Sequence, residues 1–380
     1  LLFPILVLLV IPYLLVGVIA AGKFIQPTTA GLFPDAFPMP PLPNGQPHPL
    51  NGGIPPWLGS AVVCFIVLFY VFFGGLRGAV WANTFQTIVF MVTGVIAFYM
   101  ISKNLGGLKA ASESVLASDF ASARASREGM IGKLEFLSYC FVPLSVGMFP
   151  HLFQHWLTAK SAKSFKLTVV AHPVFIMIVW LPCILIGIWA AAYLGPLGEG
   201  QSPNSVLGRM VGQLVHSPVL SGLVGAGVLA AIMSSLDSQF MCLGTMFTND
   251  IVVRKFGADR FSDSQKILIA RGFILLVVGI TYLLSLWLMN SAHVFDLGVW
   301  CFSGFAGLFP LIVGALYWKG TTAAGAFASV ISVVVVWCVL FYRDIIAVKP
   351  AGGASDELLI FGMMPVAIIV AVSTLSLVVV

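Results

Sequence analysis

The stretch AAIMSSLDSQF carries five polar side chains inside an otherwise apolar run near the middle of the 380-residue chain. On a helix, Ala231, Ser234, Ser235 and Ser238 follow the i, i+3, i+4, i+7 spacing and share one face, with Asp237 on its flank. Two hydroxyls and a backbone carbonyl beside a small residue suit a hard cation such as Na⁺, which prefers oxygen ligands. The Ala231 carbonyl would be available because Ser235 can perturb the hydrogen bond to position i−4. The pattern predicts a cation site; the alternative is that these serines only bond to their own helix or pack closely.

Other reactive residues give little indication of enzyme chemistry. His151 and His155 in HLFQH have the spacing of a metal pair, but no glutamate or third ligand accompanies them. GLVGAG at 222–227 follows no strand, so it indicates close helix packing and not a dinucleotide loop. The six cysteines form no CxxC motif and suggest core packing. We therefore expect no enzyme activity, no cofactor and no metal other than Na⁺.

The elements that position these residues are membrane-spanning helices. Hydrophobic residues make up 59% of the chain, charged residues 9%, and the mean hydropathy is +1.03, whereas a soluble domain carries about 25% charged residues. Backbone groups in a bilayer are satisfied only within helices or closed barrels, and the alternation typical of barrel strands is absent. An all-α polytopic fold is predicted, with ten apolar stretches of roughly 20 residues each, near 1–25, 58–75, 82–102, 136–156, 167–195, 218–246, 265–289, 298–318, 321–342 and 358–380.

The loops set an expected orientation. If the first span runs outward, the inner loops hold ten basic and three acidic residues, while the outer side holds nine basic and ten acidic ones. Residues 26–57, rich in Pro and Gly, are expected to form an irregular outer cap. Segments 105–130 and 204–216 are expected to form short helices on the outer surface. The chain starts without Met and ends inside an apolar span, so we interpret it as truncated at both ends.

Three stretches together resemble the sodium:solute symporter family. GVLAAIMSSLDSQFMCLGTMFTNDIV is similar to the family's signature helix, with a small residue, two adjacent hydroxyls and a following T-x-D-I. FFGGLRGAVWANTFQ at 72–86 resembles its G-G-L-R-x-V-x-W-T-D-x-x-Q stretch. PHLFQHWLTAKSAKSFK at 150–166 resembles its P-H…R-x-x-x-A-K segment. Their order and spacing fit, and the resemblance runs over essentially the whole chain.

The resemblance implies a leucine-transporter-type fold of two inverted five-helix repeats, with broken helices and midplane sites. Residues 1–380 would form a single transmembrane transporter domain holding core helices three to ten and two peripheral helices, with the first core helices missing. The family's sodium ligands fall on Ala231, Ser234 and Ser235. Asp237, Ser238 and Asn83 would support the ion path.

The span 136–156 would be the sixth core helix, and we expect it to be interrupted near Gly147 to Pro150, because Pro removes a backbone donor and Gly permits a bend. The freed backbone groups would line the solute pocket or its gate, through Gly147, Phe149, Pro150, His151 and Gln154. The alternative is a proline kink without a ligand.

Two positions depart from the family pattern. The W-T-D triplet reads Trp81-Ala82-Asn83, so an amide replaces an acid on the inner sodium route, and H⁺ remains open as the coupling ion. The usual Arg after P-H is replaced by Gln154-His155, which alters charge pairing at the inner gate.

The function implied is a sodium-coupled secondary active symporter of the cell membrane, which imports a small organic solute by alternating access. The FPH sequence is closer to the proline, pantothenate and monocarboxylate branches than to the sugar branch, which favours an organic anion or amino acid. No nucleic-acid partner is expected. The alternatives are a proton-coupled symporter and a membrane-embedded solute sensor of a signalling protein.

Overall fold

The computed structural model describes residues 2–42, 45–125, 131–157, 159–198, 203–289, 294–347 and 359–380. Within these ranges the regular structure is helical, apart from one isolated bridge between Ile360 and Met363. Eight helical segments there are long and apolar enough to cross a membrane, counting Pro56–Gly75 and Arg77–Asn104 separately and Val294–Tyr317 as one. A bent pair, Lys133–Met148 with Pro150–Leu157, gives a ninth if it is counted as one span. The prediction of an all-helical, multi-pass chain is confirmed.

The helices occur in an order that matches the ten predicted stretches. They are α1 Leu2–Thr28, α2 Pro56–Asn104, α3 Gly107–Ala117, α4 Asp119–Ala125, α5 Lys133–Tyr139, η1 Val142–Met148, α6 Pro150–Leu157, η2 Ala162–Ser164, α7 Phe165–Leu194, η3 Pro203–Ser205, α8 Val206–Leu214, α9 Pro218–Met246, η4 Phe247–Val253, α10 Arg254–Phe256, η5 Ala258–Arg260, α11 Asp263–Leu288, α12 Val294–Ala306, α13 Phe309–Tyr317, α14 Ala323–Phe341, η6 Tyr342–Ala347 and α15 Pro365–Val379.

Two boundaries differ from those predicted. The stretches 58–75 and 82–102 join into one helix, α2, which is broken only at Gly75, where φ is 53° and ψ is −154°. The last stretch, predicted over 358–380, is helical only over Pro365–Val379, which is 15 residues. Proline is favoured at the first helical position, so α15 begins at Pro365.

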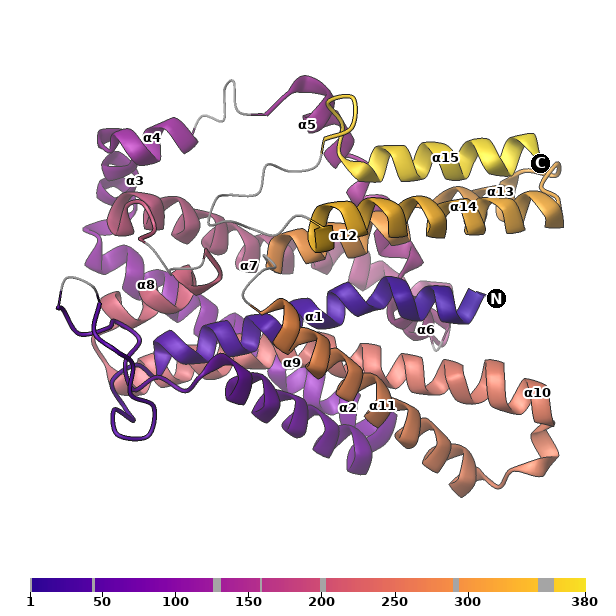
Figure 1. Cartoon of the computed structure of the whole chain (residues 1–380), viewed down its shortest axis with the longest axis horizontal. Helices are drawn as coiled ribbons and strands as arrows, with labels where there is room; N and C mark the ends of the chain where they lie inside the picture. Colours follow the sequence, from indigo (N-terminus) through magenta and orange to yellow (C-terminus); the bar gives the residue numbers. More distant parts are fainter. Residues whose placement is uncertain are drawn as a thin grey trace.

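Helix α1 forms the centre of the molecule. It contacts α2, α9, α11 and α12, and it lies between the α12–α15 group and the α2, α9 and α11 group in Figure 1. Leu9, Leu14 and Val18 of α1 are fully buried. Much of the hydrophobic core therefore surrounds this one helix, as expected for a bundle in lipid, where tight packing replaces the hydrophobic effect between helices.

Helices α2 and α9 share the most extensive contact in the described chain. At Gly227 an added Cβ would lie 1.8 Å from Thr93 Oγ1, whereas at Gly222 it would meet nothing within 4 Å. The close packing predicted from GLVGAG is thus confirmed at Gly227, and it brings the middle of α9 against the second half of α2.

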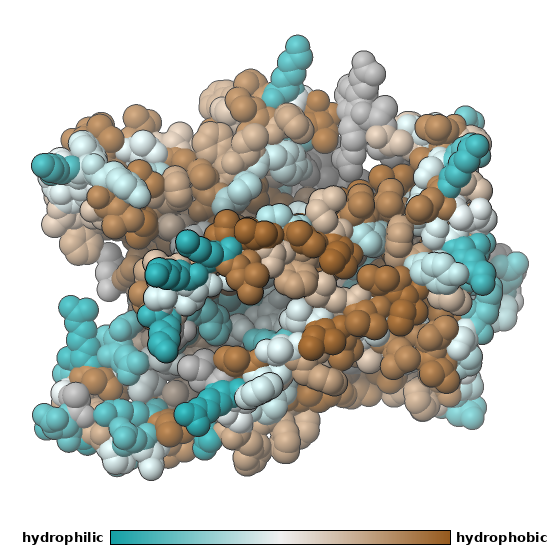
Figure 2. Space-filling view, turned by 180° about the vertical axis from the view of Figure 1, so that it is seen from behind, coloured by the Kyte–Doolittle hydropathy of each residue, from teal (hydrophilic) through white to brown (hydrophobic). Residues whose placement is uncertain are grey.

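The surface has the apolar character expected of a lipid-facing protein. Large exposed side chains include Phe69 on α2, Val169 on α7, Leu268 on α11 and Val339 on α14. Figure 2 shows hydrophobic residues over much of one face, with hydrophilic residues mainly toward its left and right margins.

The segment after α1 has no helix over residues 29–55 where the structure describes it, as predicted. Backbone bonds such as Gly31 N–H to the Asn51 carbonyl fold it onto itself, and Asn51 Oδ1 accepts from Met39 N–H at 2.7 Å. The predicted short helices appear as α3, α4 and α8, while residues 126–130 lie outside the described ranges. This segment, α3, α4 and α8 gather at one end of the molecule, and α10 lies at the other (Figure 1).

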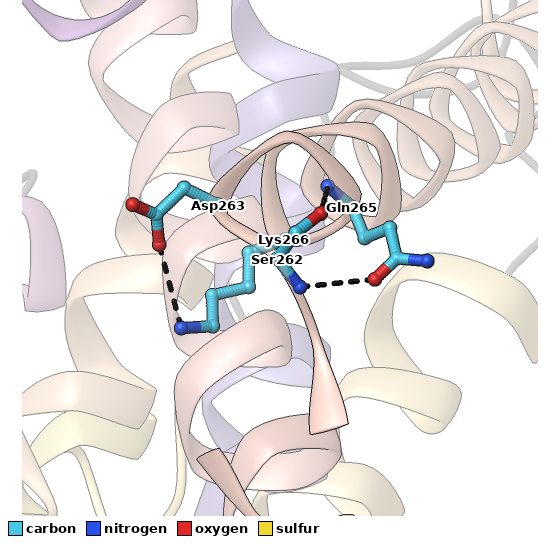
Figure 3. Close-up of polar contacts among 4 residues, drawn as sticks. All are labelled: Ser262, Asp263, Gln265 and Lys266. Atoms are coloured by element: carbon cyan, nitrogen blue, oxygen red, sulfur yellow. Dashed lines mark hydrogen bonds and ion pairs between the residues drawn. The ribbon is translucent and has the colours of Figure 1, made fainter. Parts of the chain in front are cut away.

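At the α10 end, α11 begins with a capping box (Figure 3). Gln265 N–H donates to Ser262 Oγ at 3.3 Å, and Ser262 N–H donates to Gln265 Oε1 at 2.9 Å. Lys266 Nζ lies 3.5 Å from Asp263 Oδ1. The reciprocal bonds satisfy donors of the first turn, so the sequence S-D-S-Q fixes where this helix starts.

Candidate functional site

A pocket of about 450 Å³ lies where α1, α2, α9, α12 and the η1–α6 junction meet. Its wall joins stretches that are far apart in the sequence and brings many of the predicted site residues together. The lining residues are Tyr13, Asn83, Val146, Phe149, His151, Leu152, His155, Ser234, Ser235, Ser238 and Phe302.

The serine stripe of α9 faces this pocket and also bonds to its own helix. Ser234 Oγ donates to the Ala231 carbonyl at 3.0 Å. The predicted perturbation of this carbonyl therefore comes from Ser234 at i+3 and not from Ser235 at i+4. Ser235 and Tyr13 of α1 line the same pocket. The stripe thus lines the pocket with serines, of which Ser234 also bonds to its own helix.

Asp237 is fully buried on the flank of the stripe and is held by hydroxyl groups. Tyr70 Oη donates to Asp237 Oδ2 at 3.0 Å, and Ser238 Oγ lies 3.1 Å from Asp237 Oδ1. Asn83 Nδ2 donates to Ser238 Oγ at 2.9 Å. The three residues predicted for the ion path therefore form one hydrogen-bonded network with Tyr70. Such partners are needed because burying a carboxylate without them costs free energy.

One acceptor in this network has no partner. Asn83 Oδ1 is buried without a hydrogen bond among the described residues, and so is Gln86 Oε1 one turn further along α2. Buried polar atoms normally find a partner. An unmatched oxygen beside a buried carboxylate and a serine hydroxyl is what a cation or an ordered water would require.

The interruption predicted in the span 136–156 is present. The 3₁₀ helix η1 ends at Met148, Phe149 is extended with φ −66° and ψ 121°, and α6 starts at Pro150. The two parts of this span are bent by 47°. The break falls at Phe149 because Pro150 lacks a backbone donor and fits the first position of a new helix.

Not all predicted gate residues reach the pocket. Phe149 and His151 are buried and line it, whereas Gly147, Pro150 and Gln154 do not. His155 lines it in place of Gln154, because residues i and i+4 of α6 share a face and His151 already points inward.

Aromatic rings form another part of the pocket wall. The Tyr13 ring centroid lies 5.5 Å from that of Phe149 and 5.9 Å from that of Phe302. Phe149 also lies 4.6 Å from Phe305 behind it, and His151 stacks with Tyr13 at 6.4 Å. Sequence reasoning missed Tyr13 and Phe302. A tyrosine hydroxyl inside an apolar span was a signal for the first, and no signal separated the second from the other phenylalanines.

A second, apolar cavity of about 370 Å³ lies behind the stripe, between α1, α2, α7, α8 and α9. Tyr13 and Ser235 line both cavities, and Ala231 lines only this one. The predicted sodium ligands therefore lie at the junction of two cavities, with open space beside them.

A multi-pass helical chain with a broken helix opposite a polar stripe has the architecture of a membrane transporter. Residues 56–332 match the sodium:solute symporter family, and the chain belongs to that family. The family resemblance seen in the three sequence stretches is thereby confirmed.

Two relatives are similar in sequence to most of the chain. The sodium/proline symporter of Staphylococcus aureus is 27% identical over 287 residues, which cover 73% of this chain and 55% of the relative. The same figures hold for the sodium/proline symporter of the S. aureus strain Newman. The chain thus spans about half the length of the curated relatives it matches.

A solved structure shares the fold. It is a Na⁺-coupled sialic acid symporter in a substrate-bound outward-open state, with a TM-score of 0.66, 16% identity, and coverage of 99% of this chain and 73% of the other. The predicted leucine-transporter-type fold is confirmed.

Proposed function

We propose that the protein is a sodium-coupled secondary active symporter that imports a small organic solute by alternating access. The observation that carries this proposal is the shared pocket in which the hydroxyls of Ser234 and Ser235 face Phe149 and His151 of the broken helix. Membership of a family of sodium:solute symporters supports Na⁺ as the coupling ion.

The sodium site is proposed at the Ala231 carbonyl and the hydroxyls of Ser234 and Ser235. Ser234 Oγ lies 3.0 Å from that carbonyl, so the two oxygens already converge. A hydroxyl rotates about its C–O bond, and turning the Ser234 hydrogen away would leave both oxygens facing one cation. Binding of Na⁺ then exchanges one hydrogen bond for two oxygen ligands. We propose that residues 1–380 form a single transporter domain and that groups outside the α9 stripe supply the remaining ligands.

The network of Asp237, Ser238 and Asn83 is proposed as the supporting ion path. Ser238 follows Ser234 by one helical turn, and its hydroxyl lies 3.3 Å from the Ser234 carbonyl. A cation that leaves Ser234 and Ser235 toward Ser238 would next meet the Asp237 carboxylate and Asn83 Oδ1, which has no hydrogen-bond partner among the described residues. These oxygen atoms would give Na⁺ successive ligands along α9, so the ion would not have to pass a long apolar stretch without a ligand.

The solute pocket is proposed between the serine stripe and the rings of Tyr13, Phe149 and Phe302. A small organic anion or an amino acid is the favoured cargo. Entry of one Na⁺ down the membrane potential supplies about 2.3 kcal/mol per 100 mV. Closure of the broken helix over the pocket would then move Na⁺ and the solute across the membrane together.

The proposal is tested by uptake into proteoliposomes that contain the full-length protein, with a panel of amino acids and small monocarboxylates. An inward Na⁺ gradient and an inward proton gradient are imposed separately at equal membrane potential. We expect at least one solute to accumulate with the Na⁺ gradient and not with the proton gradient. Accumulation driven by protons alone would contradict the proposal, as would solute binding without transport, which is the behaviour of a sensor.

A further inference from the structure

A third cavity, of about 800 Å³, lies at the end of the molecule where α8 and the segment after α1 gather (Figure 1). It is lined by the last turns of α1, by α8, by Leu42 and residues 48–50 of the segment after α1, and by the start of α9. Its lining includes several neutral polar side chains, such as Gln26 and Gln213. This cavity is separate from the pocket at the broken helix.

The ionisable residues that line it, among those the structure describes, are Lys23, His48, Arg209 and His216. None of these side chains is acidic, and Lys and Arg are the types that ordinarily carry positive charge at neutral pH. Lys23 and Arg209 each also take part in a further interaction within the protein.

His48 also lines the cavity. Its Nδ1 accepts a hydrogen bond from Leu50 N–H at 3.1 Å, which ties the ring to the backbone. The other ring nitrogen, Nε2, is the one that can donate to a ligand.

The basic groups sit on firmly packed elements. α8 packs against α1, and at Gly208 an added Cβ would lie 2.9 Å from Pro27 Cγ. This close approach fixes Arg209, the next residue, beside the end of α1 that carries Lys23. The first turn of α9, which holds Pro218 and Ser221, also lines the cavity, and the start of a helix carries partial positive charge.

We propose that this cavity is an anion-binding vestibule that captures the carboxylate group of a solute before it reaches the transport pocket. Lys23 and Tyr13 lie on the same helix ten residues apart, which is about 15 Å at 1.5 Å per residue. A carboxylate held by Lys23 and Arg209 would therefore wait about three turns from the aromatic wall. This inference rests on the proposed function, and it narrows the cargo to solutes that carry a carboxylate.

The probe pair is propionate and propionamide, which have nearly the same size and differ in charge. Thermal protection of the purified full-length protein is measured in Na⁺-free detergent solution, because a ligand that binds the folded state raises its stability. We expect propionate to protect and propionamide not to. Lys23→Gln and Arg209→Gln should each raise the half-saturating propionate concentration about tenfold, the effect of losing one charged partner.

Three matched variants complete the test. Lys103→Gln removes an exposed charge outside the cavity and should change nothing. Arg209→Lys keeps the charge and should retain binding, which separates a charge effect from misfolding. His151→Ala alters the transport pocket, so propionate protection that is lost in His151→Ala but kept in both Gln variants would place the bound propionate in that pocket and overturn the vestibule.

Equal protection by propionate and propionamide would overturn the vestibule, as would unchanged propionate binding in both Gln variants. Prior occupation by phosphatidylglycerol that blocks propionate would also count against it, since the anion would then be a lipid phosphate. Each of these results is compatible with sodium-driven uptake, so it would leave the proposed function standing. Conversely, intact propionate binding without sodium-driven uptake would contradict the proposed function alone.

Discussion

The hydroxyl of Ser234 illustrates how single atoms would select the ion. It donates to the Ala231 carbonyl at 3.0 Å. A cation competes directly with that hydrogen bond. The site would therefore bind Na⁺ weakly enough to release it on the inner side.

Ser234→Ala and Ser235→Ala are each expected to raise the Na⁺ concentration for half-maximal uptake, because each removes one oxygen ligand. A contact of about 1–2 kcal/mol corresponds to roughly five- to thirtyfold in affinity. Ser238→Ala should have a smaller effect, since that hydroxyl is occupied by Asp237 and Asn83. Uptake is measured as a function of Na⁺ concentration, and rates should partly recover at saturating Na⁺. Unchanged Na⁺ dependence in all three variants would reduce the stripe to a packing face.

Asn83→Asp tests whether the lower network holds cations. The new carboxylate would lie beside Ser238 and Asp237, and two buried carboxylates resist joint ionisation. We expect a lower melting temperature in Na⁺-free buffer and a larger stabilisation by Na⁺ than in the wild type. Asn83→Ala removes the same donor without adding charge and serves as the control. A Na⁺ response that is the same in both variants would show that no cation visits this network.

Helix α2 connects the site to the rest of the bundle through its break at Gly75. Tyr70 precedes the break and Asn83 follows it, and both reach the Asp237–Ser238 pair on α9. At the break, the Arg271 guanidinium of α11 donates to the Phe72 carbonyl and lies 5.7 Å from the Phe72 ring centroid. The kink, and not a straight helix, places both partners of the network.

Gly75→Ala is expected to destabilise the protein by about 1–3 kcal/mol, because φ 53° with ψ −154° is a conformation that essentially only glycine adopts. Gly74→Ala is the matched control, since an added Cβ there also meets nothing within 4 Å and its φ is not in the positive range. Chemical denaturation of the two variants compares them. Equal stability of both would mean that the kink is not strained.

The helices could be predicted from the sequence more accurately than the contacts between them. Each of the ten apolar stretches holds a helix, and the interruption beside Pro150 was predictable because proline restricts the backbone in a known way. Tyr13 and Phe302 were missed, because periodicity shows which face of a helix is apolar but not which helix it meets. His155 was singled out for its spacing and for charge pairing at the gate, but it was not predicted to line the pocket. Gly147 was chosen for flexibility, whereas the extended residue is Phe149.

The charge distribution over the whole molecule predicts its orientation in the membrane. Lys160, Lys163 and Lys166 occur close together in the chain, and clusters of this kind favour the cytoplasmic side. Ser161 is exposed, so a cysteine there should stay unlabelled by an impermeant thiol reagent in intact cells and react after permeabilisation. Asp35→Cys in the segment after α1 is the control and should react in intact cells. Ready labelling at position 161 in intact cells would show that this loop faces outward and that the predicted orientation is wrong.

The central claim is that Na⁺ on the α9 stripe and a solute cross the membrane together. It is tested most directly by uptake of radioactive Na⁺ into proteoliposomes that contain the full-length protein, without a Na⁺ gradient and with or without an inward gradient of the best solute from the uptake panel. We predict that the solute gradient accelerates Na⁺ entry in the wild type. In the Ser234→Ala/Ser235→Ala double variant, this acceleration should vanish at low Na⁺ and return as Na⁺ is raised. Solute entry with no change in Na⁺ uptake by the wild type would contradict the account.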